Sequence, residues 1–130
     1  MIYLDSSALV KLAVQESETA ALKRWLRRRT KVARLTSDLA RVEVARAVMR
    51  SAPTALLQAH QVVARLQTVV ISGPVLDSAA ALQPATLRSL DAIHLASAMA
   101  LRPHLTAFVA YDQRLLDCAK DLGLPINSPV

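Results

Sequence analysis

Four acidic residues stand at positions where an acid needs an explanation. Asp5 and Asp112 each follow a short apolar run, at the point where a buried strand would end. Glu43 and Asp91 lie in segments that otherwise carry Ala, Val, Ile and Leu at helical spacing. Because a lone carboxylate in an apolar interior is costly to keep ionised, these acids require a compensating partner.

Two interpretations of these acids are open. Taken singly, Asp5 or Asp112 is better explained as a helix N-cap that follows a strand, because Asp caps helices well. Taken as four, gathered carboxylates would raise one another's pKa, and a divalent cation would neutralise them. An all-oxygen set favours Mg²⁺ or Mn²⁺ over zinc, which prefers His and Cys. Such an ion can activate water, polarise a phosphoryl oxygen and stabilise a departing alkoxide, which is the chemistry of phosphodiester hydrolysis.

The apolar pattern predicts elements that would bring the acids together. We expect strands at about 1–4, 32–36, 68–71 and 106–111, a helix that begins at Ser6 or Ser7, and further helices at about 17–29, 38–50, 53–67, 74–83, 88–101 and 113–122. Short apolar strands that alternate with helices predict an α/β fold, because parallel neighbours need helical crossovers. Ligands of open parallel sheets bind at the carboxyl ends of the strands, where Asp5 and Asp112 are expected.

The composition limits the class of protein. The length of 130 residues fits one domain over 1–130, and charges interrupt the apolar runs before they reach membrane-spanning length. An acid at position 5 does not fit a signal peptide, so we expect a soluble cytoplasmic protein without a membrane partner. The single Cys118 excludes an internal disulfide and a multi-cysteine zinc cluster. A net charge of +6 with only 3% aromatic residues predicts a polyanionic partner that is held by its backbone.

Four segments in order resemble PIN domains of the VapC type, namely IYLDSSALVKL, TSDLARVEVARA, LRSLDAIHLASA and VAYDQRLLDCAKDLGL. They span nearly the whole chain. The four segments in order indicate the family strongly, although any one of them alone is weak evidence. The resemblance implies a three-layer α/β/α fold around a central parallel sheet of four to five strands. It also implies a metal-dependent endoribonuclease, the toxin of a toxin-antitoxin pair, which a VapB-like antitoxin inhibits.

The resemblance assigns roles to particular residues. It places catalytic metal ligands at Asp5, Glu43, Asp91 and Asp112, with Mg²⁺ or Mn²⁺ as cofactor and Ser7 as a support for the metal or its waters. The chain departs from many relatives in having Tyr111, where they have Thr or Ala before the last acid.

Other polar residues are interpreted as lying outside the site. His94 follows Asp91 by one helical step, but a His on an apolar helix more often packs and forms hydrogen bonds than binds a ligand. Lys11 and Arg114 either contact substrate or balance carboxylate charge. Seven basic residues in the 23–34 segment either steer RNA phosphates, dock an acidic antitoxin segment, or form a solvated helix end; they are Lys23, Arg24, Arg27, Arg28, Arg29, Lys31 and Arg34.

Three rival functions are weighed against the nuclease. A non-catalytic PIN-fold module that binds RNA or protein is the nearest, and the intact set of four acids argues against it. A phosphate-receiving signalling domain would need an acid after the middle strand, and a Rossmann or P-loop protein needs more than the two glycines present. The apolar surplus also predicts exposed apolar surface, which suits a homodimer contact or an antitoxin groove.

Overall fold

Five parallel strands form one sheet at the centre of the structure, a computed structural model that describes residues 1–130. The strands are β1 (Ile2–Leu4), β2 (Arg34–Ser37), β3 (Gln67–Val69), β4 (Ala107–Val109) and β5 (Ile126–Asn127), in the order β3-β2-β1-β4-β5. β1 pairs with β2 on one side and with β4 on the other, so all three of its residues are fully buried.

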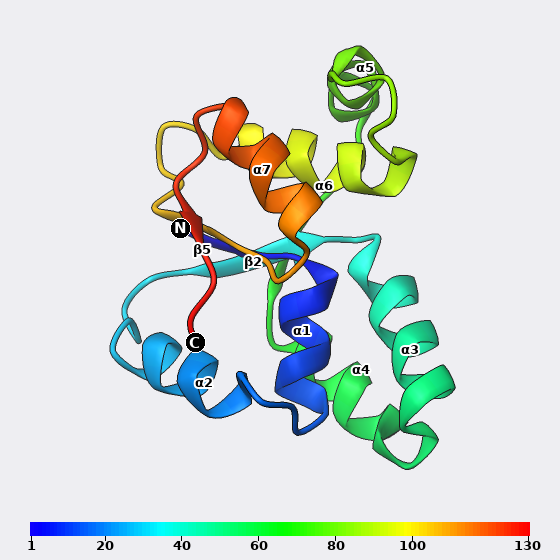
Figure 1. The fold of residues 1–130 in the computed structure, drawn as a ribbon, viewed down its shortest axis with the longest axis vertical. Helices are drawn as coiled ribbons and strands as arrows, with labels where there is room; N and C mark the ends of the chain where they lie inside the picture. Colours follow the sequence, from blue (N-terminus) through cyan, green and yellow to red (C-terminus); the bar gives the residue numbers. More distant parts are fainter.

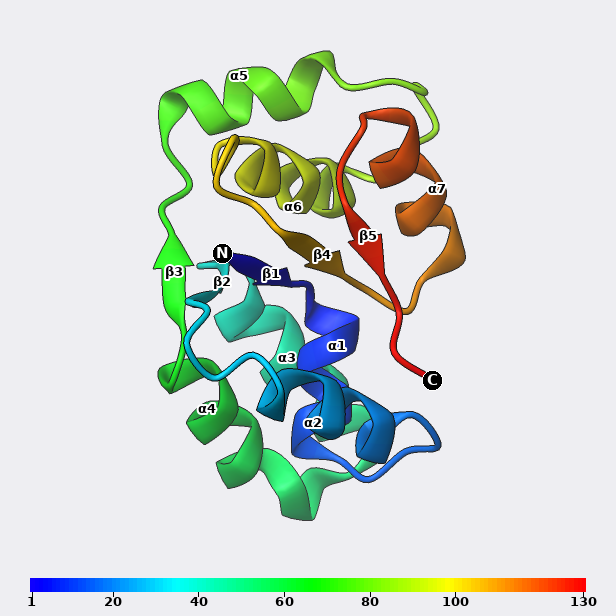
Figure 2. The ribbon, with the colours of Figure 1, turned by 90° about the vertical axis from the view of Figure 1, so that its left-hand side faces the viewer.

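Helices cover both faces of this sheet (Figures 1 and 2). One layer contains α1 (Ser6–Ala13), α2 (Thr19–Arg27), α3 (Ala40–Ser51) and α4 (Leu56–Ala64), with the short 3-10 turn η1 (Pro53–Ala55) before α4. The other contains α5 (Gly73–Ala81), α6 (Ser89–Met99) and α7 (Gln113–Asp121). The three-layer α/β/α fold with a parallel sheet is therefore confirmed, and the sheet has five strands.

Alternating strand residues supply the two halves of the core. Ile2 and Leu4 pack with α1 to α4, whereas Tyr3 faces α6 and α7 and stacks on Phe108 with ring centroids 5.4 Å apart. α5 packs on the outer side of α6 through Val75 and Ala79. Because α6 lies between the sheet and α5, its polar residues are buried as well as its apolar ones.

Several element boundaries differ from the predicted ones. The residue that caps α1 is Asp5, not Ser6 or Ser7, because the Asp5 side chain accepts the N–H of Ala8. The edge strand β5 was not predicted, since its two residues are too few to show a pattern. The end of α7 agrees with the prediction, as Gly123 takes the left-handed conformation (φ 74°) that stops a helix. None of the helices combines the length and the apolar character needed to span a lipid bilayer.

Candidate functional site

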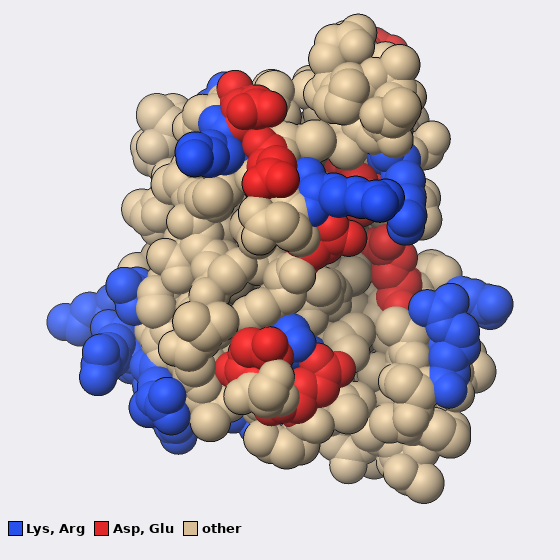
Figure 3. Space-filling view, viewed as in Figure 1, with Lys and Arg blue, Asp and Glu red and all other residues tan.

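Asp5, Glu43, Asp91 and Asp112 all line one cavity of about 590 Å³, beside the carboxyl ends of β1 and β4. Asp5 follows β1, and Asp112 begins α7 three residues after β4. Glu43 and Asp91 lie in the first turns of α3 and α6, which belong to opposite layers. Figure 3 shows acidic side chains in the hollow between these layers, with basic side chains to either side. The fold thus gathers the four acids that the sequence singled out.

Asp5 caps α1 and also faces this cavity. Its side chain is 4% exposed, and its Oδ1 accepts the Ala8 N–H at 3.0 Å and the Ser7 hydroxyl at 2.6 Å. Burial raises the pKa of Asp5, although the Ser7 hydroxyl and the Ala8 N–H oppose that rise. The capping role and the site role therefore coincide in one residue, although the sequence offered them as alternatives.

Ser7 connects Asp5 to the segment that follows β4. Its hydroxyl donates to Asp5 and accepts the backbone N–H of Tyr111 at 2.9 Å. The hydroxyl proton is therefore committed to a carboxylate of the site, and Ser7 fixes the distance between the two segments that supply Asp5 and Asp112. The predicted role of Ser7 as a direct support for a metal or its waters stays a prediction.

Glu43 is held from two elements by its Oε1 atom. The Ser6 hydroxyl donates to it at 2.8 Å, and Nε2 of His94 lies 2.5 Å from it. Burial by itself would raise the pKa of Glu43, but the hydrogen bond and charge of His94 and the hydrogen bond from Ser6 together lower it. Glu43 is therefore held in its ionised form.

Asp91, in the first turn of α6, and Asp112, the N-cap of α7, line the same cavity. Asp112 is an N-cap, as predicted, and its Oδ1 accepts the N–H groups of Arg114 at 2.9 Å and Leu115 at 3.2 Å. Asp91 forms no hydrogen bond with another side chain or with the backbone. Burial, followed by the charge of Asp112, raises the pKa of Asp91. The charges of His94 and Arg88 oppose that rise, but neither residue forms an ion pair with Asp91 or Asp112.

The free carboxylate oxygens fit a hard cation. In Asp5, Glu43 and Asp112 the protein's donors occupy a single oxygen, and the second oxygen receives none. Oxygen ligands of this kind are those that Mg²⁺ and Mn²⁺ prefer. As the side chains stand, however, no three acidic, His or Cys residues are close enough to hold one ion together. Metal binding by the four acids therefore stays a prediction.

Residues that the sequence analysis did not place in the site also line the cavity. They include Ser6, His94, Arg46, Arg50 and Arg88. His94 is packed and hydrogen-bonded, as predicted, but one of its partners is an acid of the site. Its position three residues after Asp91 places both on one face of α6, which was the available signal. Arg46 and Arg50 follow Glu43 by three and seven residues, so they share its face of α3.

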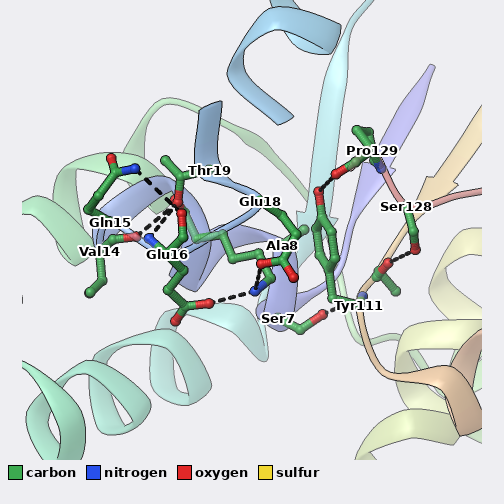
Figure 4. Close-up of polar contacts among 12 residues, drawn as sticks. Ser7, Ala8, Val14, Gln15, Glu16, Glu18, Thr19, Tyr111, Ser128 and Pro129 are labelled. Carbon is green, nitrogen blue, oxygen red and sulfur yellow. Dashed lines mark hydrogen bonds and ion pairs between the residues drawn. The ribbon is translucent and has the colours of Figure 1, made fainter. Parts of the chain in front are cut away.

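The basic residues singled out in the sequence lie elsewhere. None of the seven in the 23–34 segment lines the acid cavity, and α2 lies on the opposite side of α1 from α3 (Figures 1 and 2). Lys11 forms ion pairs with Glu16 at 2.6 Å and Glu18 at 2.7 Å, so it balances carboxylates outside the site (Figure 4).

Comparisons with known proteins agree with this architecture. The family model of the PIN domain matches residues 2–121. Ribonuclease VapC46 of Mycobacterium tuberculosis is 46% identical over 128 residues, which cover 98% of this chain and 97% of the relative. Ribonuclease VapC47 from the same species is 43% identical over 132 residues, covering 99% of this chain and 97% of the relative. The crystal structure of Mycobacterium tuberculosis VapC20, described as a toxin that cleaves the sarcin-ricin loop, superposes with a TM-score of 0.73 at 15% identity, covering 95% of this chain and 96% of that one.

Proposed function

Since the chain belongs to the PIN-domain family and, within it, to the VapC ribonucleases, we propose that it is an endoribonuclease toxin whose RNA is cut at the four-acid cavity. One observation carries the assignment of the site. Acids from four separate segments of the chain line a single cavity, and none of them is paired with a lysine or arginine. A non-catalytic PIN module would not need four acids at one cavity.

Asp5, Glu43 and Asp91 would hold the principal Mg²⁺ or Mn²⁺ ion, and Asp112 would complete its shell or serve a second one. Bound there, the ion would supply positive charge to activate water and to stabilise the leaving oxygen. The chain itself keeps Asp5 in place through the α1 cap and Ser7, and keeps Glu43 ionised through Ser6 and His94. We expect products with a 5′-phosphate and a 3′-hydroxyl.

Arg46, Arg50 and Arg88 are suited to contact RNA phosphates on either side of the cut. All three line the acid cavity, are exposed, and form no ion pair. With aromatic residues at only 3% of the chain, stacking on bases contributes little to affinity. Replacing Arg46 and Arg50 with Ala should therefore weaken RNA binding and reduce its salt dependence, whereas an unchanged salt slope would exclude these contacts.

An antitoxin partner is expected on another face. A groove of about 280 Å³ has an apolar floor that includes Leu12, Leu26 and Val62, and its basic rim consists of Lys23, Arg27, Arg34 and Arg65. An amphipathic helix with acidic residues beside its apolar face would match this groove. The 23–34 segment would then dock the antitoxin and not RNA. Binding of the cognate antitoxin that is unaffected by Arg27→Glu would refute this assignment. A homodimer and a cytoplasmic location also stay predictions.

Incubation with a cellular RNA pool tests the catalytic function. Cleavage should occur with Mg²⁺ or Mn²⁺ and stop in chelator, and mapping of the new ends should show one preferred sequence or structure. Asp5→Asn should reduce cleavage roughly 100- to 1000-fold, since it removes a charge at the reaction centre. The variant should still fold, because Asn caps helices about as well as Asp.

Glu16→Gln is the matched control, because it neutralises an acid that lies outside the cavity and is paired with Lys11. It should retain wild-type cleavage. Cleavage that persists in chelator, or an Asp5→Asn variant as active as Glu16→Gln, would overturn the proposal.

A further inference from the structure

Tyr3, His94 and Glu43 form a hydrogen-bonded chain that runs from the centre of the sheet to the acid cavity. Oη of Tyr3 lies 2.7 Å from Nδ1 of His94, and Nε2 of His94 lies 2.5 Å from Oε1 of Glu43. Tyr3 is 0% exposed and His94 is 2% exposed, whereas the Glu43 side chain is 23% exposed. The chain thus connects a residue without solvent contact to one that lines the cavity.

The direction of the hydrogen bond to Glu43 follows from the groups present. The ionised Glu43 can only accept, so Nε2 of His94 must carry the hydrogen. At the other side of the ring, Nδ1 lies within hydrogen-bonding distance of the buried Tyr3 hydroxyl, which can donate or accept. Nε2–H therefore donates to Glu43, and Nδ1 shares the other hydrogen bond with the Tyr3 hydroxyl.

The hydrogen bond from His94 occupies one specific oxygen of Glu43. Oε1 accepts from His94 and also from the Ser6 hydroxyl, and no protein donor reaches Oε2. The His94 ring is itself held by its burial in α6 and by an edge contact with the Tyr3 ring, whose centroid lies 5.9 Å away. A rotation of the Glu43 carboxylate would break both hydrogen bonds to Oε1. The arrangement therefore fixes which oxygen remains available.

We propose that Tyr3 and His94 are positioning residues that hold Oε1 of Glu43 and so present Oε2 to the divalent cation, an inference that rests on the proposed function. Partners behind a metal-binding carboxylate orient it and commonly alter metal affinity by about 10- to 100-fold. Tyr3 and His94 act here only through Glu43, and neither is assigned contact with RNA.

Three variants separate positioning from mere packing. His94→Leu fills the space of the imidazole but removes the donor to Glu43. His94→Gln keeps an N–H for Glu43 and an oxygen for the Tyr3 hydroxyl. Tyr3→Phe keeps the ring that stacks on Phe108 and removes only the hydroxyl. The unfolding temperature in chelator measures how much each substitution lowers the stability of the fold when no cation is bound.

Mn²⁺ affinity, measured by calorimetry on the folded variants, is the first readout. His94→Leu should bind Mn²⁺ about 10- to 100-fold more weakly than the wild type. His94→Gln should remain within about threefold of the wild type, and Tyr3→Phe should fall between these two. A purely structural role would lower the unfolding temperature of these variants without this ranking of affinities. Equal affinity of His94→Leu and wild type would overturn the inference.

The ¹⁵N spectrum of the imidazole is the second readout, and it requires no cation. The His94 signals, identified by their absence in His94→Gln, should show a protonated Nε2, and Tyr3→Phe should shift the Nδ1 signal. An unprotonated Nε2 in the wild type would refute the inference even if the enzyme cleaves RNA. A wild type that neither binds Mn²⁺ nor cleaves RNA would instead refute the proposed function, and the imidazole spectrum would still decide the hydrogen-bonded chain.

Discussion

Two clusters of acids lie next to each other in this protein, and they differ in how their charge is compensated. In the Lys11 cluster, Glu16 and Glu18 share the ammonium of Lys11, which also lies 4.8 Å from the centre of the Tyr111 ring (Figure 4). In the four-acid cavity, Asp91 and Asp112 form no ion pair with a lysine or arginine, and the pKa of Asp91 is raised. Ser7 and Asp112 border both regions, so the two environments are separated by only a few residues.

The comparison shows that clustered acids are not evidence of a site by themselves. The Lys11 cluster closes the turn between α1 and α2, where the Thr19 hydroxyl also donates to the Lys11 carbonyl at 2.8 Å. Its charges are satisfied within the protein, and the hydrogen bonds and charges of its acids raise the pKa of Lys11 despite the opposing effect of burial. The four-acid cavity instead retains free carboxylate oxygens. Carboxylate oxygens without a protein partner, and not the number of acids, distinguish the functional region.

A divalent cation should produce the largest difference between the clusters. At a Mn²⁺ concentration about 100 times the dissociation constant, the cation should stabilise the wild type by about 2.7 kcal/mol, because it binds the folded chain alone. Asp91→Asn should lose most of this gain, and Glu18→Gln should keep it. Differential scanning calorimetry with Mn²⁺ and with chelator measures both. An equal gain in all three proteins would mean that the cation binds outside the four-acid cavity.

Without a divalent cation, removing one charged group from each cluster should change stability in opposite directions. Asp91→Asn should raise the melting temperature in chelator by roughly 1–2 °C, because it removes a partly buried charge that Asp112 repels. Lys11→Met should lower it by roughly 2–4 °C, since the methionine replaces the lysine stem but leaves Glu16 and Glu18 without their cation. Melting curves in chelator at neutral pH test this, and shifts of the same sign would erase the distinction drawn between the clusters.

The sequence was sufficient to predict that Asp5 and Asp112 lie close together, because this depends on local features. A short apolar run followed by an acid marks the end of a buried strand, and parallel strands end at one edge of the sheet. Both acids could therefore be assigned to that edge from the sequence alone. Strand β5 could not be predicted, since two residues, Ile126 and Asn127, are too few to show a periodicity.

Contacts between helices that are far apart in the sequence could not be predicted, for a different reason. His94 and Glu43 are 51 residues apart, and their contact depends on the rotation of α3 and α6 about their own axes. Periodicity gives the buried face of each helix but not which residues of two faces meet. The ion pairs of Lys11 were missed even though Glu16 is only five residues away, because a turn stabilised by Thr19, and not a helix, brings them together.

Lowering the pH should produce the smallest change in melting temperature, and this change should be confined to the Lys11 cluster. The hydrogen bond from Lys11 lowers the pKa of Glu18 from 4.5 to about 2. Because the pKa is lower in the folded chain, the resulting stability is present above the unfolded value of 4.5 and is lost as the pH falls through about 2. Glu18→Gln should therefore melt slightly below the wild type near neutral pH, and the gap should close as the solution is acidified.

Asp77→Asn provides the control for that titration, because Asp77 is an exposed acid on α5 without an ion pair. Its melting temperature should stay close to that of the wild type across the same range. High salt should also narrow the gap for Glu18→Gln, since this pair is partly exposed and therefore screened. A gap that persists at the lowest pH would show that Glu18 stabilises the turn through packing or uncharged hydrogen bonds, and the Lys11 cluster would then no longer be the electrostatically compensated counterpart of the four-acid cavity.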